Sequence, residues 1–319
     1  MTFRTIQIEK GVPGYASINP NTNTAYISYT LSNFVIVVNL EKGSIESKVQ
    51  LTCPGNIAIN IVTNKVYVSS AYGVCEIDGE NNNYHIINIG LPHSGGSVDV
   101  NPLTNLLHTT CFGHDILTVI DAATGAIADK IPVGKNPKGV AVDTSTNKVY
   151  VANYDAQSIS VIDCNQSNRL VDSIRLNRKL DNTNTSPRFM LVNELSKLIY
   201  VQASVGTSGG TSYETLLVID KDTKKTIQRE SAPSHAQEGF AFNRSSNTLY
   251  MKKNREMTIL RFDAYAKKVI HTTTLQNRSF WQRLYESFRH FAEVIATNPS
   301  TSKVYVSDSK NNLLYEIEG

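Results

Sequence analysis

The chain has 319 residues, of which 40% are hydrophobic and 18% are charged, and its formal net charge at pH 7 is +3. It is long enough to bury a large core, but it has no run of basic residues that could follow a phosphate backbone, so we expect no nucleic-acid partner. No apolar stretch is long enough to span a bilayer, and the first residues lack the apolar segment of a secretory signal. We therefore expect a cytoplasmic protein, or an extracellular one if a leader has been removed.

The four cysteines do not show the spacing of a zinc site. Cys53, Cys75, Cys111 and Cys164 are widely separated and form no CxxC pair. Such spacing is typical of reduced thiols rather than of a disulfide framework. We expect buried or partly buried thiols, and no metal held by them.

Along the chain, seven similar units follow a short N-terminal strand, "RTIQIE" (4–9). Each unit has an anchor residue in a run that resembles "KVYV". The anchors are Tyr26, Tyr67, His108, Tyr150, Tyr200, Tyr250 and Tyr305, spaced by 41, 41, 42, 50, 50 and 55 residues. Self-similarity near this period indicates a solenoid or a propeller.

The unit around Tyr150 shows four strands. "GVAVD" (139–143) alternates, "KVYVAN" (148–153) is rich in β-branched residues, "SISVID" (158–163) alternates again, and "LVDSIRL" (170–176) ends the unit. The segments between them are rich in Asn, Asp and Ser, which favour turns. Each unit is therefore predicted to form a four-stranded antiparallel sheet.

The two ends of the sequence complement each other. The last unit has "EVIATN" (293–298), "KVYVSD" (303–308) and "LLYEIEG" (313–319), and then lacks one strand. The segment 4–9 can supply that strand and remove an exposed edge. We predict an all-β protein, a seven-bladed β-propeller of four-stranded antiparallel blades. It forms one domain over 1–319, in which the N-terminal strand completes the last blade.

The runs "KVYVAN" and "SISVID" resemble the YVTN family of β-propeller repeats. "YVAN", "YVSS" and "YVSD" stand here where that family has Tyr-Val-Thr-Asn, and the resemblance covers essentially the whole chain. It implies a propeller related in build to archaeal surface-layer proteins and to lactonases and lyases. It implies no common catalytic motif.

Three units are longer than the others. The added segments are 177–187, 205–214 and 277–292. Each follows a second or a fourth strand, so up-and-down topology places all three on one face, near blades 5–7. Long loops on a rigid scaffold are where binding usually occurs.

Only the segment 277–292 has the residue pattern of a helix. Ser279 and Gln282 form a capping-box pattern, and an aromatic stripe follows at helical spacing. The stripe either packs over the end of the ring or forms a lid or docking surface, because aromatic and arginine side chains are typical of binding hot spots. The residues of such a partner site would be Trp281, Tyr285, Phe288 and Arg289.

The residues twelve positions before each anchor are predicted to surround one mouth of the central channel. They are Gly14, Gly55, Gly96, Lys138, Arg188, Glu238 and Glu293. Glycine there would permit close approach of backbones near the axis. The four charged side chains either form rim salt bridges or, with His235 nearby, bind a polar ligand.

Two functions follow from this pattern. The favoured one is a monomeric, non-enzymatic scaffold without a cofactor, which presents blades 5–7 to a protein or a polar ligand. The alternative is a lactonase- or lyase-like enzyme, in which Glu238 or Glu293 acts as general base or ligates a divalent cation. Lys138 or Arg188 would then hold an anionic substrate.

Overall fold

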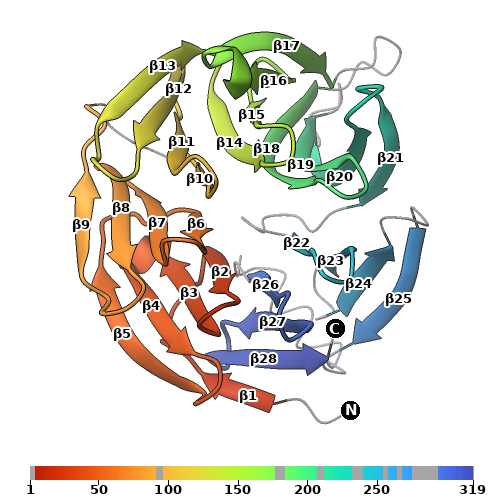
Figure 1. Ribbon diagram of the computed structural model, residues 1–319. Coiled ribbons are helices and arrows are strands. Elements are labelled where there is room, and N and C mark those ends of the chain that lie inside the picture. Colours follow the sequence, from red (N-terminus) through yellow and green to blue (C-terminus); the bar gives the residue numbers. More distant parts are fainter. Residues whose placement is uncertain are drawn as a thin grey trace.

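The protein is a ring of seven four-stranded antiparallel sheets around a central axis (Figure 1). The computed structural model describes residues 4–90, 96–176, 184–206, 212–231, 240–253, 258–263, 268–274 and 294–318. Each sheet is one blade, and its first strand lies next to the axis. The predicted all-β, seven-bladed propeller is therefore confirmed.

The strands follow the repeat. Blade 1 has β2 (Tyr15–Asn19), β3 (Thr24–Tyr29), β4 (Phe34–Asn39) and β5 (Ser44–Gln50). Blade 2 has β6 (Ile57–Asn60), β7 (Lys65–Ser70), β8 (Gly73–Asp78) and β9 (Tyr84–Ile87). Blade 3 has β10 (Val98–Asn101), β11 (Leu106–Cys111), β12 (His114–Asp121) and β13 (Ile127–Pro132). Blade 4 has β14 (Pro137–Asp143), β15 (Lys148–Asn153), β16 (Ser158–Asp163) and β17 (Arg169–Arg175).

The remaining blades contain the longer units. Blade 5 has β18 (Asn184–Asn193), β19 (Leu198–Gly206), β20 (Ser212–Asp220) and β21 (Thr226–Ser231). Blade 6 has β22 (Phe240–Asn243), β23 (Thr248–Lys253), β24 (Thr258–Asp263) and β25 (Lys268–Thr274). Blade 7 has β26 (Ile295–Asn298), β27 (Lys303–Asp308), β28 (Leu313–Glu318) and β1 (Arg4–Gln7). The described residues also contain two single turns of 3₁₀ helix, η1 (Thr30–Ser32) and η2 (Cys164–Gln166).

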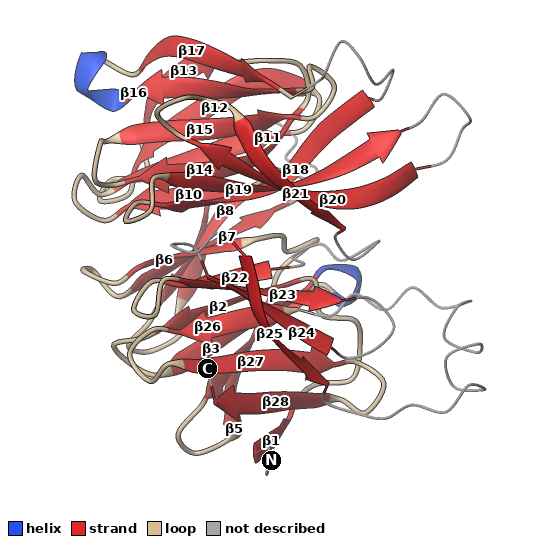
Figure 2. Cartoon of the chain, turned by 90° about the vertical axis from the view of Figure 1, so that its right-hand side faces the viewer, coloured by secondary structure: helices blue, strands red, loops and turns tan. Residues whose placement is uncertain are grey.

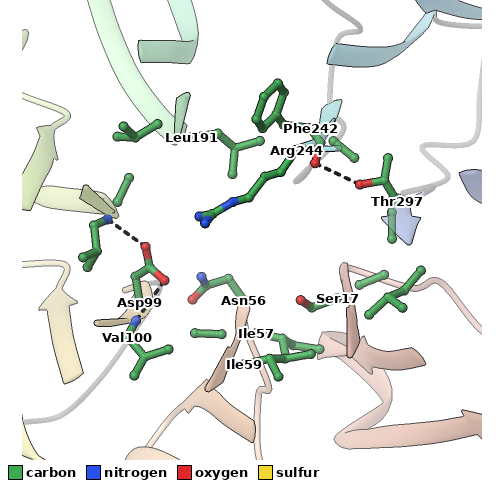
Figure 3. Close-up of a pocket in the computed structure, with 18 of the residues that line it drawn as sticks. Ser17, Asn56, Ile57, Ile59, Asp99, Val100, Leu191, Phe242, Arg244 and Thr297 are labelled. Atoms are coloured by element: carbon green, nitrogen blue, oxygen red, sulfur yellow. Dashed lines mark hydrogen bonds between the residues drawn. The ribbon is translucent and has the colours of Figure 1, made fainter. Parts of the chain in front are cut away.

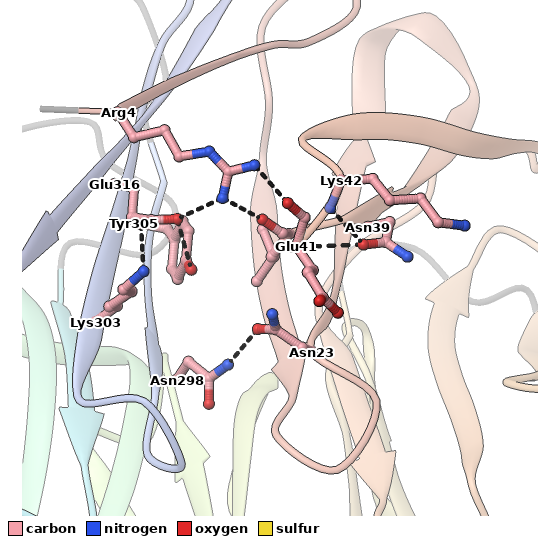
Figure 4. A network of polar contacts seen from close by, with 10 residues as sticks. Arg4, Asn23, Asn39, Glu41, Lys42, Asn298, Lys303, Tyr305 and Glu316 are labelled. Carbon is pink, nitrogen blue, oxygen red and sulfur yellow. Dashed lines mark hydrogen bonds and ion pairs between the residues drawn. The ribbon is translucent and has the colours of Figure 1, made fainter.

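The N-terminal strand closes the ring as predicted. β1 pairs antiparallel with β28, and Ile6 lies opposite Leu314 with only 1% of its surface exposed. Arg4 adds polar contacts, because its Nη1 donates to the carbonyl of Leu40 at 2.8 Å and lies 3.5 Å from Glu316 (Figure 4). The closing strand thus joins blade 7 to blade 1 and covers an edge that would otherwise be open.

The anchor residues pack between the blades. Tyr67, for example, belongs to the same hydrophobic cluster as Ala58 of its own blade and Val98 of the next, and it is fully buried. His108 takes the same place in blade 3, where its Nε2 lies 3.8 Å from Sγ of Cys164. Burial lowers the pKa of His108 to about 4, so the imidazole is neutral at physiological pH.

The described part of the chain contains four free cysteines. Cys75 and Cys111 are buried and Cys164 is half-buried, as expected, but Cys53 is exposed. Cys53 has a left-handed backbone, with φ of 49°, in the turn after β5. Turn geometry rather than packing therefore determines its position.

Side-chain amides tie neighbouring blades together. An Asn at the end of one inner strand donates to an Asn in the first turn of the following blade at 2.7–2.9 Å. The pairs are Asn19–Asn64, Asn60–Asn105, Asn101–Asn147, Asn193–Asn247 and Asn298–Asn23. Between blades 4 and 5 a buried ion pair stands instead, with Lys221 Nζ 2.5 Å from Asp143.

The ring has two faces (Figure 2). We call upper the face with the turns between second and third strands, and lower the face with the turns between first and second strands. The predicted insertions 177–187 and 205–214 border β18, β19 and β20 on the upper face. Their described parts are not loops, because Asn184–Asn193 and Leu198–Gly206 pair as longer strands. The helix predicted for 277–292 lies outside the described residues.

Candidate functional site

Two of the predicted rim residues lie together on the upper face. The carbonyl of Arg188 would be 2.7 Å from a Cβ placed on Gly139, so a glycine at 139 allows β14 to approach β18 closely. Lys138 precedes this glycine, and Arg188 lies close enough to help lower the pKa of Lys138, after the larger effect of burial. Gly55 of the rim also permits close contact, since a Cβ there would lie 2.3 Å from Ser69 Oγ.

Both upper-rim cations are engaged within the protein. Nζ of Lys138 lies 4.1 Å from the ring centre of Tyr154 and 4.8 Å from that of Phe112, a cation–π arrangement. Arg188 pairs with the largely buried Glu214 at 3.0 Å, and Ser204 donates a second hydrogen bond to the same carboxylate oxygen. Neither contact joins two of the predicted rim residues, so the choice between rim salt bridges and a polar ligand site stays a prediction.

The other predicted site residues lie outside the described residues. These are Glu238, Glu293, His235, Trp281, Tyr285, Phe288 and Arg289. The carboxylate site and the aromatic docking surface therefore stay predictions.

A cavity of about 340 Å³ occupies the axis of the ring. It is lined by all seven inner strands and by residues that directly follow them, namely Pro20, Ile61, Pro102, Thr144, Arg244 and Pro299. These residues come six positions after the upper-rim residues, roughly 20 Å at about 3.3 Å per residue. The cavity therefore reaches the lower face, and its lining also includes Asn56 and Phe189, each next to a residue of the predicted mouth.

Asp99 is the acidic group of this cavity. It stands on β10 at a position where the other inner strands carry Ser17, Ala58, Ala141, Leu191, Ala241 and Ala296. Its two carboxylate oxygens accept backbone hydrogen bonds at 2.8 Å, one from Val100 and one from Val142 of the next blade. Surrounding protein raises the pKa of Asp99 to about 6, against the effect of these two bonds and of nearby Arg244.

Arg244 is the basic group of the cavity. It follows β22, and its side chain extends across the cavity toward the side on which Asp99 lies (Figure 3). The side chain is exposed, and no side chain or carbonyl of a described residue accepts a hydrogen bond from it. The guanidinium and the Asp99 carboxylate thus face one cavity without forming an ion pair with each other.

Most of the remaining wall is apolar. Ile57, Ile59, Leu191 and Phe242 surround the two charged groups (Figure 3). Asn56 contributes little free polarity, because its amide exchanges hydrogen bonds of 2.7 and 2.8 Å with the backbone of Val98. A concave, mostly apolar site with a few polar groups is typical of small-molecule binding.

Sequence reasoning did not identify Asp99 and Arg244, because it compared the repeats at one rim position only. Both could have been found by comparing the repeats at other positions. Asp99 lies two residues before the Asn that ends its inner strand, and Arg244 lies one residue after the corresponding Asn of blade 6. Among the described residues, no group of three or more His, Cys, Asp or Glu could hold a metal ion. Nor does this part of the chain contain a helix with the length and hydropathy needed to cross a membrane.

Neither a family model nor a curated protein sequence matches this chain. Its structure is similar to a chain from Kuenenia stuttgartiensis hydrazine synthase, with a TM-score of 0.75 and 14% sequence identity. The similarity covers 98% of this chain and 97% of that chain. At such low identity it establishes the propeller fold and nothing finer, a fold that suits both scaffolds and enzymes.

Proposed function

We propose that this protein is a non-enzymatic binding scaffold, which takes up a small polar ligand at the lower end of its axial channel. The observation that carries this proposal is the exposed Arg244 guanidinium, which faces an apolar cavity and has no partner among the residues whose positions are described. A guanidinium presents a planar fork of donors that matches a carboxylate or a phosphate. The ligand is therefore expected to carry an anionic group.

A binding screen tests this proposal. The protein is dialysed against a library of small carboxylates and phosphates, and bound compounds are identified by mass spectrometry. Arg244→Met should abolish the retention of an anion that the native protein retains, because it removes the charge and keeps most of the side-chain volume. Arg175→Met, on the exposed outer strand of blade 4, is the matched control and should retain it. Retention that is equal in both variants would refute the channel site.

The upper face supports a second candidate, a docking site for a protein partner near blades 5–7. Its support is the length of β18, β19 and β20, with 10, 9 and 9 residues, and Tyr213 near the end of this extension is 51% exposed. Pull-down with the native protein and with Trp281→Ala would test it. Loss of a captured partner in the variant supports this candidate, and unchanged capture contradicts it.

The enzymatic alternative has one observation in its favour. Asp99 lies in a cavity with a pKa raised to about 6, and a carboxylate with such a pKa can serve as a general base near neutral pH. Incubation with a panel of lactones, with and without Mn²⁺ or Ca²⁺, tests the enzyme against the non-enzymatic scaffold. Turnover that is lost in Asp99→Asn or Glu238→Ala would establish an enzyme, and no turnover on any lactone would favour the scaffold.

A further inference from the structure

Two oppositely charged side chains face the cavity at the lower end of the channel, and they do not form an ion pair with each other. Arg244 enters from blade 6 and Asp99 from blade 3, so the two groups approach from opposite sides of the ring (Figure 3). The Asp99 carboxylate accepts one hydrogen bond on each oxygen, and a carboxylate has about four acceptor sites. It can therefore accept further donors from a ligand.

The pair selects against ligands with a single charge. A simple anion at Arg244 would share an apolar cavity with the Asp99 carboxylate, and the two negative charges would repel each other. A simple cation at Asp99 would meet the Arg244 guanidinium in the same way. A ligand with both charges satisfies both groups, and discrimination by an unpaired or repelled charge is a common source of specificity.

The walls and the volume restrict the ligand further. Leu191, Phe242, Ile57 and Ile59 offer an apolar surface around the charged groups. The volume of about 340 Å³ lies within the range of about 300–1,000 Å³ that is typical of small-molecule sites. This space suits a compact small molecule.

We infer that the channel ligand is a small zwitterion with an apolar body, of the α-amino-acid type, whose carboxylate binds Arg244 and whose ammonium group binds Asp99. This inference rests on the proposed function, because it specifies the ligand of the same site. It adds Asp99 as the residue that distinguishes a zwitterion from an anion.

Three probes with one carbon skeleton test the inference. Leucine carries both charged groups, 4-methylpentanoate lacks only the ammonium group, and 3-methylbutylamine lacks only the carboxylate. Titration calorimetry at pH 7.5 should show that the native protein binds leucine at least tenfold tighter than either of the other probes, because each lost charged hydrogen bond costs about one to two orders of magnitude in affinity.

The variants assign each group to its residue. Asp99→Asn should weaken leucine at least tenfold and leave 4-methylpentanoate unchanged or tighter. Arg244→Met should weaken both carboxylates and leave 3-methylbutylamine unchanged or tighter. Glu80→Gln and Arg175→Met are exposed controls and should behave as the native protein. These four results together support the inference.

A measurement on the native protein covers the case in which Asp99→Asn does not fold. Between pH 7.5 and pH 5.5, the affinity for leucine should fall at least twofold while that for 4-methylpentanoate does not fall. The pKa of Asp99, raised to about 6, places its loss of charge in this range, and among the described residues the charged groups that act on it are Arg244 and Glu194.

The possible failures are distinct. If 4-methylpentanoate binds as tightly as leucine and depends on Arg244, the zwitterion inference is wrong but the anion-binding channel stands. If Asp99→Asn is folded and binds leucine as tightly as the native protein, Asp99 is not the ammonium site. If none of the three probes binds and Arg244→Met retains the same compounds as the native protein in the dialysis screen, both the inference and the proposed function fail.

Discussion

At the upper end of the axial channel Lys138 and Arg188 are held by partners within the protein, whereas at the lower end Arg244 has none in the described part of the chain. Lys138 lies against two aromatic rings, and Arg188 pairs with Glu214. Charges that the fold already neutralises contribute to structure, while an unpaired charge in a cavity is available to a ligand. Substitutions at the two ends should therefore affect different properties, either stability or binding.

The largest effect is expected from the pH dependence of Asp99 at the lower end. Its pKa rises from about 3.8 to about 6 on folding, so the folded state binds more protons between these values. The free energy of unfolding should therefore fall as the pH rises from 4 to 6, by at most about 3 kcal/mol. Chemical denaturation of the native protein and of Asp99→Asn across this range isolates the effect, because the variant cannot titrate there.

His108 provides the internal control for that experiment. Its pKa falls to about 4 on folding, so it should destabilise the native protein and the Asp99→Asn variant equally as the pH drops from 6.5 to 4. The difference between the two proteins therefore reports Asp99 alone. If the difference in the free energy of unfolding between the native protein and Asp99→Asn stays constant from pH 4 to pH 6, Asp99 is solvated like an ordinary surface carboxylate.

The next effect concerns Arg188 at the upper end. Arg188→Met should lower the free energy of unfolding by about 2 kcal/mol, because it leaves the buried Glu214 carboxylate with only the hydroxyl of Ser204. The figure is below that for a fully buried pair, since the Arg188 side chain is 40% exposed. Urea denaturation measures it. Arg188→Met combined with Glu214→Gln should recover most of the loss, and no recovery would contradict an ion-pair origin.

The sequence predicted the ring but neither of the two charged groups of the channel cavity. Seven anchors, their spacing and the missing last strand determined the number of blades and the closure by β1, because hydrophobic alternation and strand count are properties of each repeat. Which side chains face the central channel depends on which positions of the seven inner strands converge there. Only the closed ring of seven blades determines those positions. Asp99 is a single acidic residue at a position where the other repeats have Ser, Ala or Leu. Such a substitution in one repeat indicates a binding site only once the structure shows that the position faces the channel.

The longer strands of blade 5 show a second limit. The segment 205–214 is an insertion relative to the other units, which suggests a loop. In the structure Val205 pairs with Tyr213 and Gly206 with Ser212, so the hairpin continues. The choice between loop and hairpin depends on this cross-strand pairing and not on the length of the insertion.

A smaller effect is expected from Lys138. Lys138→Met should lower the free energy of unfolding by about 1 kcal/mol, because it removes the cation–π contacts with Phe112 and Tyr154 but retains an unbranched apolar side chain. Thermal denaturation with Lys130→Met, an exposed lysine on β13, as control would measure it. Equal midpoints for the two variants would mean that the aromatic contacts add no stability.

Arg244 should have the smallest effect on stability. Arg244→Met is expected to change the free energy of unfolding by less than about 0.5 kcal/mol, since the side chain is exposed and makes no hydrogen bond within the described residues. The same substitution should raise the pKa of Asp99 above about 6, because Arg244 favours the ionised carboxylate. Carboxyl-carbon NMR titration of the two proteins measures that shift directly. An unchanged pKa would mean that the two groups are too far apart to hold one small ligand. A raised pKa with unchanged stability would show that the charged groups at the lower end of the channel serve binding, whereas those at the upper end stabilise the fold.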